Sequence, residues 1–174
     1  MATAEQRVES RPAPPIRVTA DDYLAFERAA ESKHELVDGR LVAMLGASFA
    51  HNSITTNLLS APHLALRQGS CLVFGSDLRV QLESDGTFAY PDVVIACGEL
   101  RARDAHLDTL LNPTIVIEVV SPSTEAYDRG RKFEKYRRID TLRQYVLVAQ
   151  DRAAVEVYTR HAGGWMLSEV AGLD

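Results

Sequence analysis

The stretch Thr114-Ile115-Val116-Ile117-Glu118-Val119-Val120 is a β-branched run that carries one carboxylate and ends at Ser121-Pro122. A run this rich in Ile and Val predicts a strand that is buried on both faces. An ionised carboxylate in such a strand costs several kcal/mol unless it is paired, protonated or bound to a metal. Glu118 is therefore the first candidate functional residue.

A second strand-like segment offers a partner for Glu118. Tyr90-Pro91-Asp92-Val93-Val94-Ile95 places an acid at the entrance of another apolar run. Two carboxylates on neighbouring strands form a hard-oxygen site suited to a divalent cation that keeps several waters. We therefore expect Asp92 and Glu118 to bind Mg²⁺ or Mn²⁺, with the main-chain carbonyl of Val119 as a third oxygen ligand.

Composition indicates one globular domain. Of the 174 residues, 46% are apolar and 25% charged, which is ordinary for a globular protein. Residues 1–15 contain three prolines and no apolar segment, which predicts a disordered leader and not a signal peptide. Residues 16–174 are then expected to form a single domain. The apolar runs are too short to cross a membrane, so we expect a cytoplasmic protein.

Charge is unevenly distributed along the chain. The formal net charge of −5 argues against a protein that coats nucleic acid with a uniformly basic surface. However, six of the 19 Lys and Arg residues lie between Arg129 and Arg138. This basic segment follows Glu118, so Arg129, Arg131 and Lys135 are candidate contacts to a DNA backbone. The alternative is an ordinary solvated helix face.

The two cysteines, Cys71 and Cys97, lie in separate strand-like segments without zinc-type spacing. Free cysteine is among the most buried residue types. We therefore expect both to be reduced core residues.

Three helices are expected from capping and periodicity. Thr19 and Ser48 are typical N-caps of the first two, and the second runs to about residue 68. Pro62 is expected to kink this second helix or divide it. The third helix covers residues 124–139, with an inner stripe formed by Phe133, Tyr136 and Ile139.

The strands follow from alternation and turn signals. Asp38-Gly39 predicts a hairpin turn within residues 35–44. Further strands are expected over residues 71–74, 78–82, 88–96, 114–120, 145–149 and 155–159, with turns at 84–86 and 162–164 and a loop over 99–112. This order of elements indicates an α/β or α+β sheet with helices on its faces.

Several motifs, taken in order, resemble one family of proteins. Pro-Asp before an apolar strand, followed by Glu on a second apolar strand, resembles the PD-(D/E)XK nuclease superfamily. Roughly residues 19–168 are similar to the Uma family of restriction-endonuclease-like proteins. The resemblance rests on residues 33–39, 46–48, 51–52, 76–80, 90–94, 117–124 and 144–148, with Asp128, Lys132 and Tyr136.

The superfamily resemblance implies a restriction-endonuclease-like mixed central β-sheet flanked by helices, bound Mg²⁺ and phosphodiester hydrolysis. It assigns Asp92 as the strand-entry acid and Glu118 as the second acid. Glu35 resembles the extra acid that many members supply from their first helix, as a metal ligand. The superfamily's lysine belongs two residues after the second acid, where this chain has Val120. In some members the following helix supplies it, and Lys132 is then the matching residue.

Several of these residues have an alternative role. Asp128 and Lys132 are spaced i, i+4 and could pair on an exposed helix face. Glu35 could be a solvated residue beside a turn. For His51, an ordinary surface or core position is favoured over a role as a base.

The sequence thus predicts a Mg²⁺-dependent DNA endonuclease with Asp92, Glu118, Lys132 and Glu35 as catalytic residues. A non-catalytic DNA-binding or assembly module and a metal hydrolase of a small phosphorylated substrate are alternatives on the same fold. The acid pair favours the enzyme, while Val120 and the acidic net charge favour the module. A homodimer would suit an enzyme that cuts both strands. The choice between DNA and RNA and the target sequence stay open.

Overall fold

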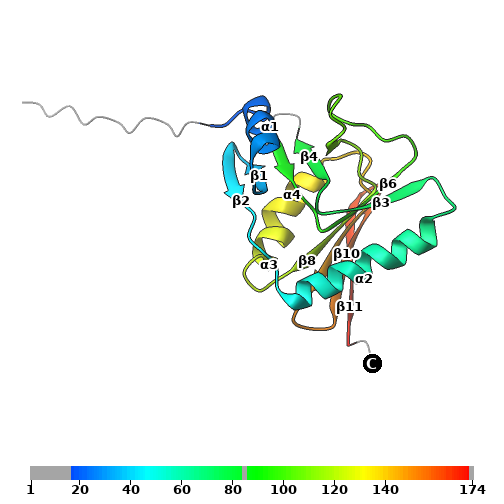
Figure 1. The fold of residues 1–174 in the computed structure, drawn as a ribbon. Coiled ribbons are helices and arrows are strands. Elements are labelled where there is room, and N and C mark those ends of the chain that lie inside the picture. Colours follow the sequence, from blue (N-terminus) through cyan, green and yellow to red (C-terminus); the bar gives the residue numbers. More distant parts are fainter. Residues whose placement is uncertain (1–16, 84–85, 173–174) are drawn as a thin grey trace, which may run out of the picture.

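A computed structural model describes residues 17–83 and 86–172, which form two mixed sheets flanked by helices (Figure 1). The five-stranded sheet has the order β2 (Arg40–Ala43), β1 (His34–Val37), β5 (Thr87–Ala89), β4 (Arg79–Glu83), β7 (Thr109–Leu110). The six-stranded sheet has the order β11 (Gly164–Ala171), β10 (Ala154–His161), β9 (Gln144–Ala149), β8 (Ile115–Val120), β6 (Val93–Cys97), β3 (Cys71–Gly75). The predicted class is confirmed, with the strands divided between two sheets. The predicted leader, residues 1–15, and positions 84–85 of a predicted turn lie outside the described residues.

The segment predicted as one strand over residues 88–96 is two strands. β5 ends at Ala89 in the five-stranded sheet, and β6 begins at Val93 in the six-stranded sheet. Pro91 lies between them, and proline has no N–H to donate to a ladder. The single-strand prediction is therefore wrong. Asp92 lies where the chain crosses from one sheet to the other.

The first two helices begin where the capping residues predict. Thr19 caps α1 (Ala20–Ala29) by accepting a hydrogen bond from the Asp22 N–H, and Ser48 caps α2 (Phe49–Leu66) in the same way. α2 runs along β3, β6 and β8. It continues through Pro62 as one helix, so the predicted division at this proline is wrong. Within the described part of the chain, no helix is long and apolar enough to span a membrane.

The third helix is interrupted by a wide turn. It consists of α3 (Glu125–Tyr127), a π-helical turn η1 (Asp128–Lys132) and α4 (Phe133–Tyr136). The predicted helix is thus present, but it ends three residues before Ile139 and is not α-helical throughout. The Phe133 N–H donates to the Asp128 carbonyl, five residues back. Single π-turns inside helices are frequent at functional sites. Tyr136 and Ile139 are buried as predicted.

Two edge strands, β11 and β7, were not predicted from the sequence. β11 was not predicted, and it pairs with β10 through the two-residue turn Ala162-Gly163. The loop expected over residues 99–112 contains β7, which pairs in parallel with β4.

Cys71 and Cys97 form a disulfide, so the prediction of two reduced cysteines is wrong. They lie directly opposite each other in the antiparallel pair β3–β6, with their Cα atoms 3.9 Å apart. Opposite residues in such a pair bring their Cβ atoms within reach of a bond between the sulfurs. This pairing depends on strand register, which residue spacing alone does not specify.

Candidate active site

A cavity of about 600 Å³ lies where the two sheets, the start of α2 and the π-turn meet. β1, the β5–β6 crossover, β8 and η1 each contribute one acid to its wall, namely Glu35, Asp92, Glu118 and Asp128. Lys132 from η1 and His51 from α2 also line it. A larger cavity of about 710 Å³, beside Arg101 and Asp104, contains none of the predicted catalytic residues.

The Lys132 ammonium lies among three carboxylates. Its Nζ is 2.9 Å from Glu118 Oε1, 3.3 Å from Glu35 Oε1 and 3.8 Å from Asp128 Oδ1. Lys132 is only 6% exposed, so the alternative of an Asp128–Lys132 pair on an exposed helix face is wrong. Glu35 is also buried and not a solvated turn residue. The structure thus brings the predicted lysine together with two of the predicted acids.

Asp92 is held from two sides. Its Oδ2 accepts a hydrogen bond from the Val119 N–H at 2.7 Å and lies 3.2 Å from His51 Nε2. Thr55 Oγ1, one turn along α2, is 3.4 Å from His51 Nδ1. The sequence favours an ordinary surface or core position for His51 and does not predict this contact with Asp92. The one signal in the sequence that pointed to His51 is its place in the motif segment 51–52. The contact itself could not be predicted, because it joins a helix to a crossover that is distant in the sequence.

Burial and charge together shift the acid–base behaviour of the cavity. Burial raises the pKa of Glu118 well above its ordinary value. Lys132 lowers this pKa, and the carboxylates of Asp92, Asp128 and Glu35 raise it. Burial alone would lower the pKa of Lys132, but Glu118, Glu35 and Asp128 raise it well above its ordinary value, so the lysine stays charged. The pKa of Asp128 is also raised by burial. The cavity wall contains four acids and two lysines, Lys132 and Lys33, and Lys33 pairs with Asp77, so negative charge is in excess.

Glu118→Gln should raise the melting temperature of the metal-free protein, by about 2–4 °C per kcal/mol of relieved charge burial. Because the pKa of Glu118 is raised in the folded state, its contribution to stability is present below the unfolded value of 4.5 and is lost as pH rises through the folded pKa. Thermal unfolding should therefore show the smallest gain near pH 4.5 and a gain that grows as pH rises toward the folded pKa of Glu118.

Glu156→Gln is the matched control for that substitution. Glu156 accepts a hydrogen bond from Arg129 at 2.9 Å, and this pair lowers the pKa of Glu156. Its loss should lower the melting temperature at neutral pH, with the difference vanishing as pH falls. If Glu118→Gln, like Glu156→Gln, melted below the wild type at alkaline pH, the claim that negative charge is in excess around Glu118 would be wrong.

The side chains of the cavity fit a hydrated divalent cation. Among residues 17–83 and 86–172, no group of three or more His, Cys, Asp and Glu side chains forms a preformed metal cluster. Mg²⁺ does not require one, because it keeps several waters and binds through one or two carboxylates. Asp92 and Glu118, with the Val119 carbonyl nearby, match that demand. The unbalanced negative charge also favours a cation.

Two of the three predicted DNA contacts are engaged by carboxylates. Arg129 bonds to Glu156, and Lys135 Nζ is 2.7 Å from Glu83 Oε2. Arg131 is exposed. None of the three belongs to the cavity wall. Of the three, only Arg131 is exposed, so the phosphate contact stays a prediction for that residue.

Comparison with protein families agrees with this architecture. The model of Uma2, described as "Putative restriction endonuclease", matches residues 20–174. This chain belongs to the Uma2 family. The family resemblance carried by the motifs is therefore confirmed.

Relatives of this Uma2 chain extend over most of its length. Two uncharacterized proteins of Synechocystis are 34% and 33% identical over 163 and 156 residues, which is 93% and 89% of this chain and 85% and 88% of theirs. A crystal structure from Anabaena variabilis, described as a putative nuclease belonging to DUF820, has a TM-score of 0.74 at 18% identity. The match covers 90% of this chain and 86% of that one. It shows a shared fold.

Proposed function

We propose that this protein is an endonuclease that hydrolyses DNA phosphodiester bonds with Mg²⁺ or Mn²⁺. The observation that carries the proposal is the buried Lys132 ammonium, 2.9 Å from Glu118 Oε1 in the cavity that also contains Asp92. This grouping is what a PD-(D/E)XK site needs when its lysine comes from the following helix. The descriptions of the family and of the Anabaena structure support the same chemistry.

Each residue of the cavity has a role in this proposal. Asp92, Glu118 and the Val119 carbonyl would hold the ion, which when bound acidifies a water and stabilises negative charge on the phosphate. The Val119 N–H keeps Asp92 in place. Lys132 would donate to the attacking water or to a phosphate oxygen. Glu35 would contact the ion directly or through a water.

Incubation with nucleic acids tests the proposal directly. Purified protein is mixed with supercoiled DNA, single-stranded DNA and RNA in Mg²⁺, Mn²⁺ or EDTA. We expect nicked or linear DNA with either metal and intact DNA with EDTA. Binding without cleavage would favour the non-catalytic module. Hydrolysis of a small phosphorylated substrate, with all polymers intact, would favour the small-substrate hydrolase.

Arg131→Ala should weaken DNA binding and reduce the slope of log affinity against log salt by about 1. Arg129→Ala should leave the slope nearly unchanged and lower the melting temperature, because it unpairs Glu156. Fluorescence anisotropy across a salt series in EDTA measures both variants. An unchanged slope in Arg131→Ala would return this helix face to the solvated alternative.

The homodimer belongs to the same proposal, while the cytoplasmic location stays a prediction that the Cys71–Cys97 disulfide does not favour, because disulfides are rare in cytosolic proteins. Two sites related by a two-fold axis would cut two strands most simply. Size-exclusion chromatography with light scattering, with and without duplex DNA, measures the oligomeric state.

A further inference from the structure

Tyr90 is connected to two of the candidate metal ligands. Its main-chain N–H donates to Glu35 Oε1 at 3.2 Å, and two residues later the chain reaches Asp92. The Tyr90 side chain is buried, and its hydroxyl accepts a hydrogen bond from Arg79 Nη1 at 2.9 Å. The same hydroxyl donates to Glu27 Oε1 at 3.0 Å.

Glu27 provides the second attachment. This buried carboxylate of α1 accepts a hydrogen bond from the His34 main-chain N–H at 2.8 Å, and its other oxygen is 3.1 Å from His34 Nδ1. His34 directly precedes Glu35 in the sequence. Glu27 is not among the residues that line the cavity, so it lies behind the acids and not beside them. One carboxylate thus anchors the chain next to Glu35 and, through Tyr90, next to Asp92.

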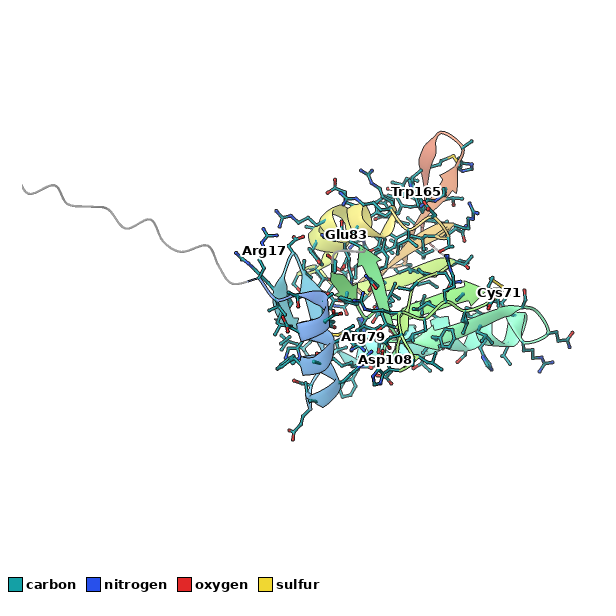
Figure 2. The ribbon with its side chains drawn as sticks, turned by 90° about the horizontal axis from the view of Figure 1, so that it is seen from above. Arg17, Cys71, Arg79, Glu83, Asp108 and Trp165 are labelled. Atoms are coloured by element: carbon teal, nitrogen blue, oxygen red, sulfur yellow. A yellow bond between two sulfur atoms is a disulfide. The ribbon has the colours of Figure 1, made fainter. Side chains whose placement is uncertain are left out.

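Arg79 fixes the other side of the Tyr90 hydroxyl. It is 3% exposed on β4, with Nη2 2.7 Å from Asp108 Oδ2 and Nε donating to Thr109 Oγ1 at 3.1 Å. Figure 2 shows Arg79 and Asp108 close together beside α1. The N–H donors of a guanidinium lie in fixed directions, so an Arg79 held by Asp108 and Thr109 also fixes the direction of its hydrogen bond to the Tyr90 hydroxyl. Burial raises the pKa of Tyr90 to about 12, so the hydroxyl keeps the proton that it donates to Glu27.

The acids need such support for a physical reason. Asp92 lies between β5 and β6, outside the strand ladders, and Glu35 lies on a strand of the other sheet from Glu118. Close carboxylates repel each other when no cation is bound. The Val119 N–H holds Asp92, and Lys132 lies between Glu35 and Glu118, but the backbone that carries Glu35 and Asp92 needs its own support.

We propose that Glu27, Tyr90 and Arg79 are positioning residues that hold Glu35 and Asp92 at the spacing a divalent cation requires. This inference rests on the proposed function, because it concerns the same metal site. Groups that orient metal ligands typically contribute about 10–100-fold to metal affinity or activity.

Manganese affinity of the intact protein, measured by calorimetry well below the melting temperature, tests this role without any need for cleavage. Tyr90→Phe removes only the hydroxyl and should weaken Mn²⁺ binding by about 10-fold or more. Glu27→Gln, which keeps an oxygen acceptor, should lose less than Glu27→Ala. Tyr158→Phe is the matched control, because its hydroxyl also bonds to a carboxylate, Glu156, at 3.1 Å and lies outside the cavity. Its Mn²⁺ affinity should equal that of the wild type.

The outcomes separate this inference from the proposed function. If wild type binds Mn²⁺, Asp92→Asn does not, and Tyr90→Phe binds as tightly as wild type, the positioning role is overturned and the proposed function stands. A lower melting temperature of Tyr90→Phe with unchanged Mn²⁺ affinity also overturns the positioning role, since it shows a purely structural hydroxyl. A wild type that does not bind Mn²⁺ overturns both.

Discussion

Lys132→Ala is expected to slow DNA cleavage by at least about 100-fold while Mg²⁺ still stabilises the fold. The Lys132 ammonium lies in the cavity wall, where it contacts the carboxylates of Glu118, Glu35 and Asp128. Its removal leaves buried carboxylates without their partner, which should destabilise the metal-free protein by about 3–5 kcal/mol. Added Mg²⁺ should recover part of this loss, because the cation replaces some of the missing positive charge. Single-turnover cleavage at saturating Mg²⁺ and thermal unfolding with and without the metal measure the two effects.

Lys135→Ala is the matched control for Lys132→Ala. Lys135 is three residues further along and forms ion pairs with Asp38 and Glu83, outside the cavity. Its loss should lower the melting temperature and leave the cleavage rate close to that of wild type. If Lys132→Ala cuts as fast as Lys135→Ala, the proposed role of the helix lysine is wrong.

Asp92→Asn is expected to remove both cleavage and the stabilising effect of divalent metal. A wild-type protein with free Mg²⁺ at about 100 times its Kd gains about 2.7 kcal/mol of stability. Asparagine keeps an oxygen that can accept the Val119 N–H, so the fold should persist, but the charge that attracts the cation is gone. The melting temperature of the variant should therefore barely change between EDTA and Mg²⁺.

Asp151→Asn provides the corresponding control. It makes the same chemical change at an exposed residue that pairs only with its neighbour Arg152 among the described residues. The metal-induced rise in melting temperature should be the same as in wild type. A rise of equal size in Asp92→Asn would place the cation elsewhere on the protein.

Local signals in the sequence were enough to predict α1, α2 and most of the strands, though not β7 or β11, and to indicate Asp92 and Glu118 as candidate residues. The Thr19 and Ser48 caps act through side-chain oxygens on nearby N–H groups, so they can be read within a few residues. Glu118 stands out in the sequence because an acid inside a buried β-branched strand is costly unless it is paired, protonated or bound to a metal. Pro91 also carried information that the prediction of a continuous strand ignored, since proline rarely lies inside a ladder.

Contacts between distant segments could not be predicted in the same way. The His51–Asp92 contact and the Cys71–Cys97 disulfide depend on how a helix docks and on strand register. Glu27 is a partial exception. It lies four residues after Tyr23 in α1, on the buried side of the helix, and a charged residue in that position needs a partner.

The widened turn of η1 has a consequence for how such a site changes over generations. An α-helix that gains one residue can absorb it as a π-turn, which leaves the helix before and after the insertion in nearly the same relative orientation. The gain of one residue requires the insertion of only a single codon. If Gly130, in the middle of the turn, were deleted and the turn closed to α-helical spacing, Asp128 and Lys132 would lie three residues apart in one α-helix instead of four residues apart across a wide turn. The spacing between Asp128 and Lys132 thus depends on the form of the turn as well as on the number of residues, so a motif with one fixed residue spacing does not describe this part of the site.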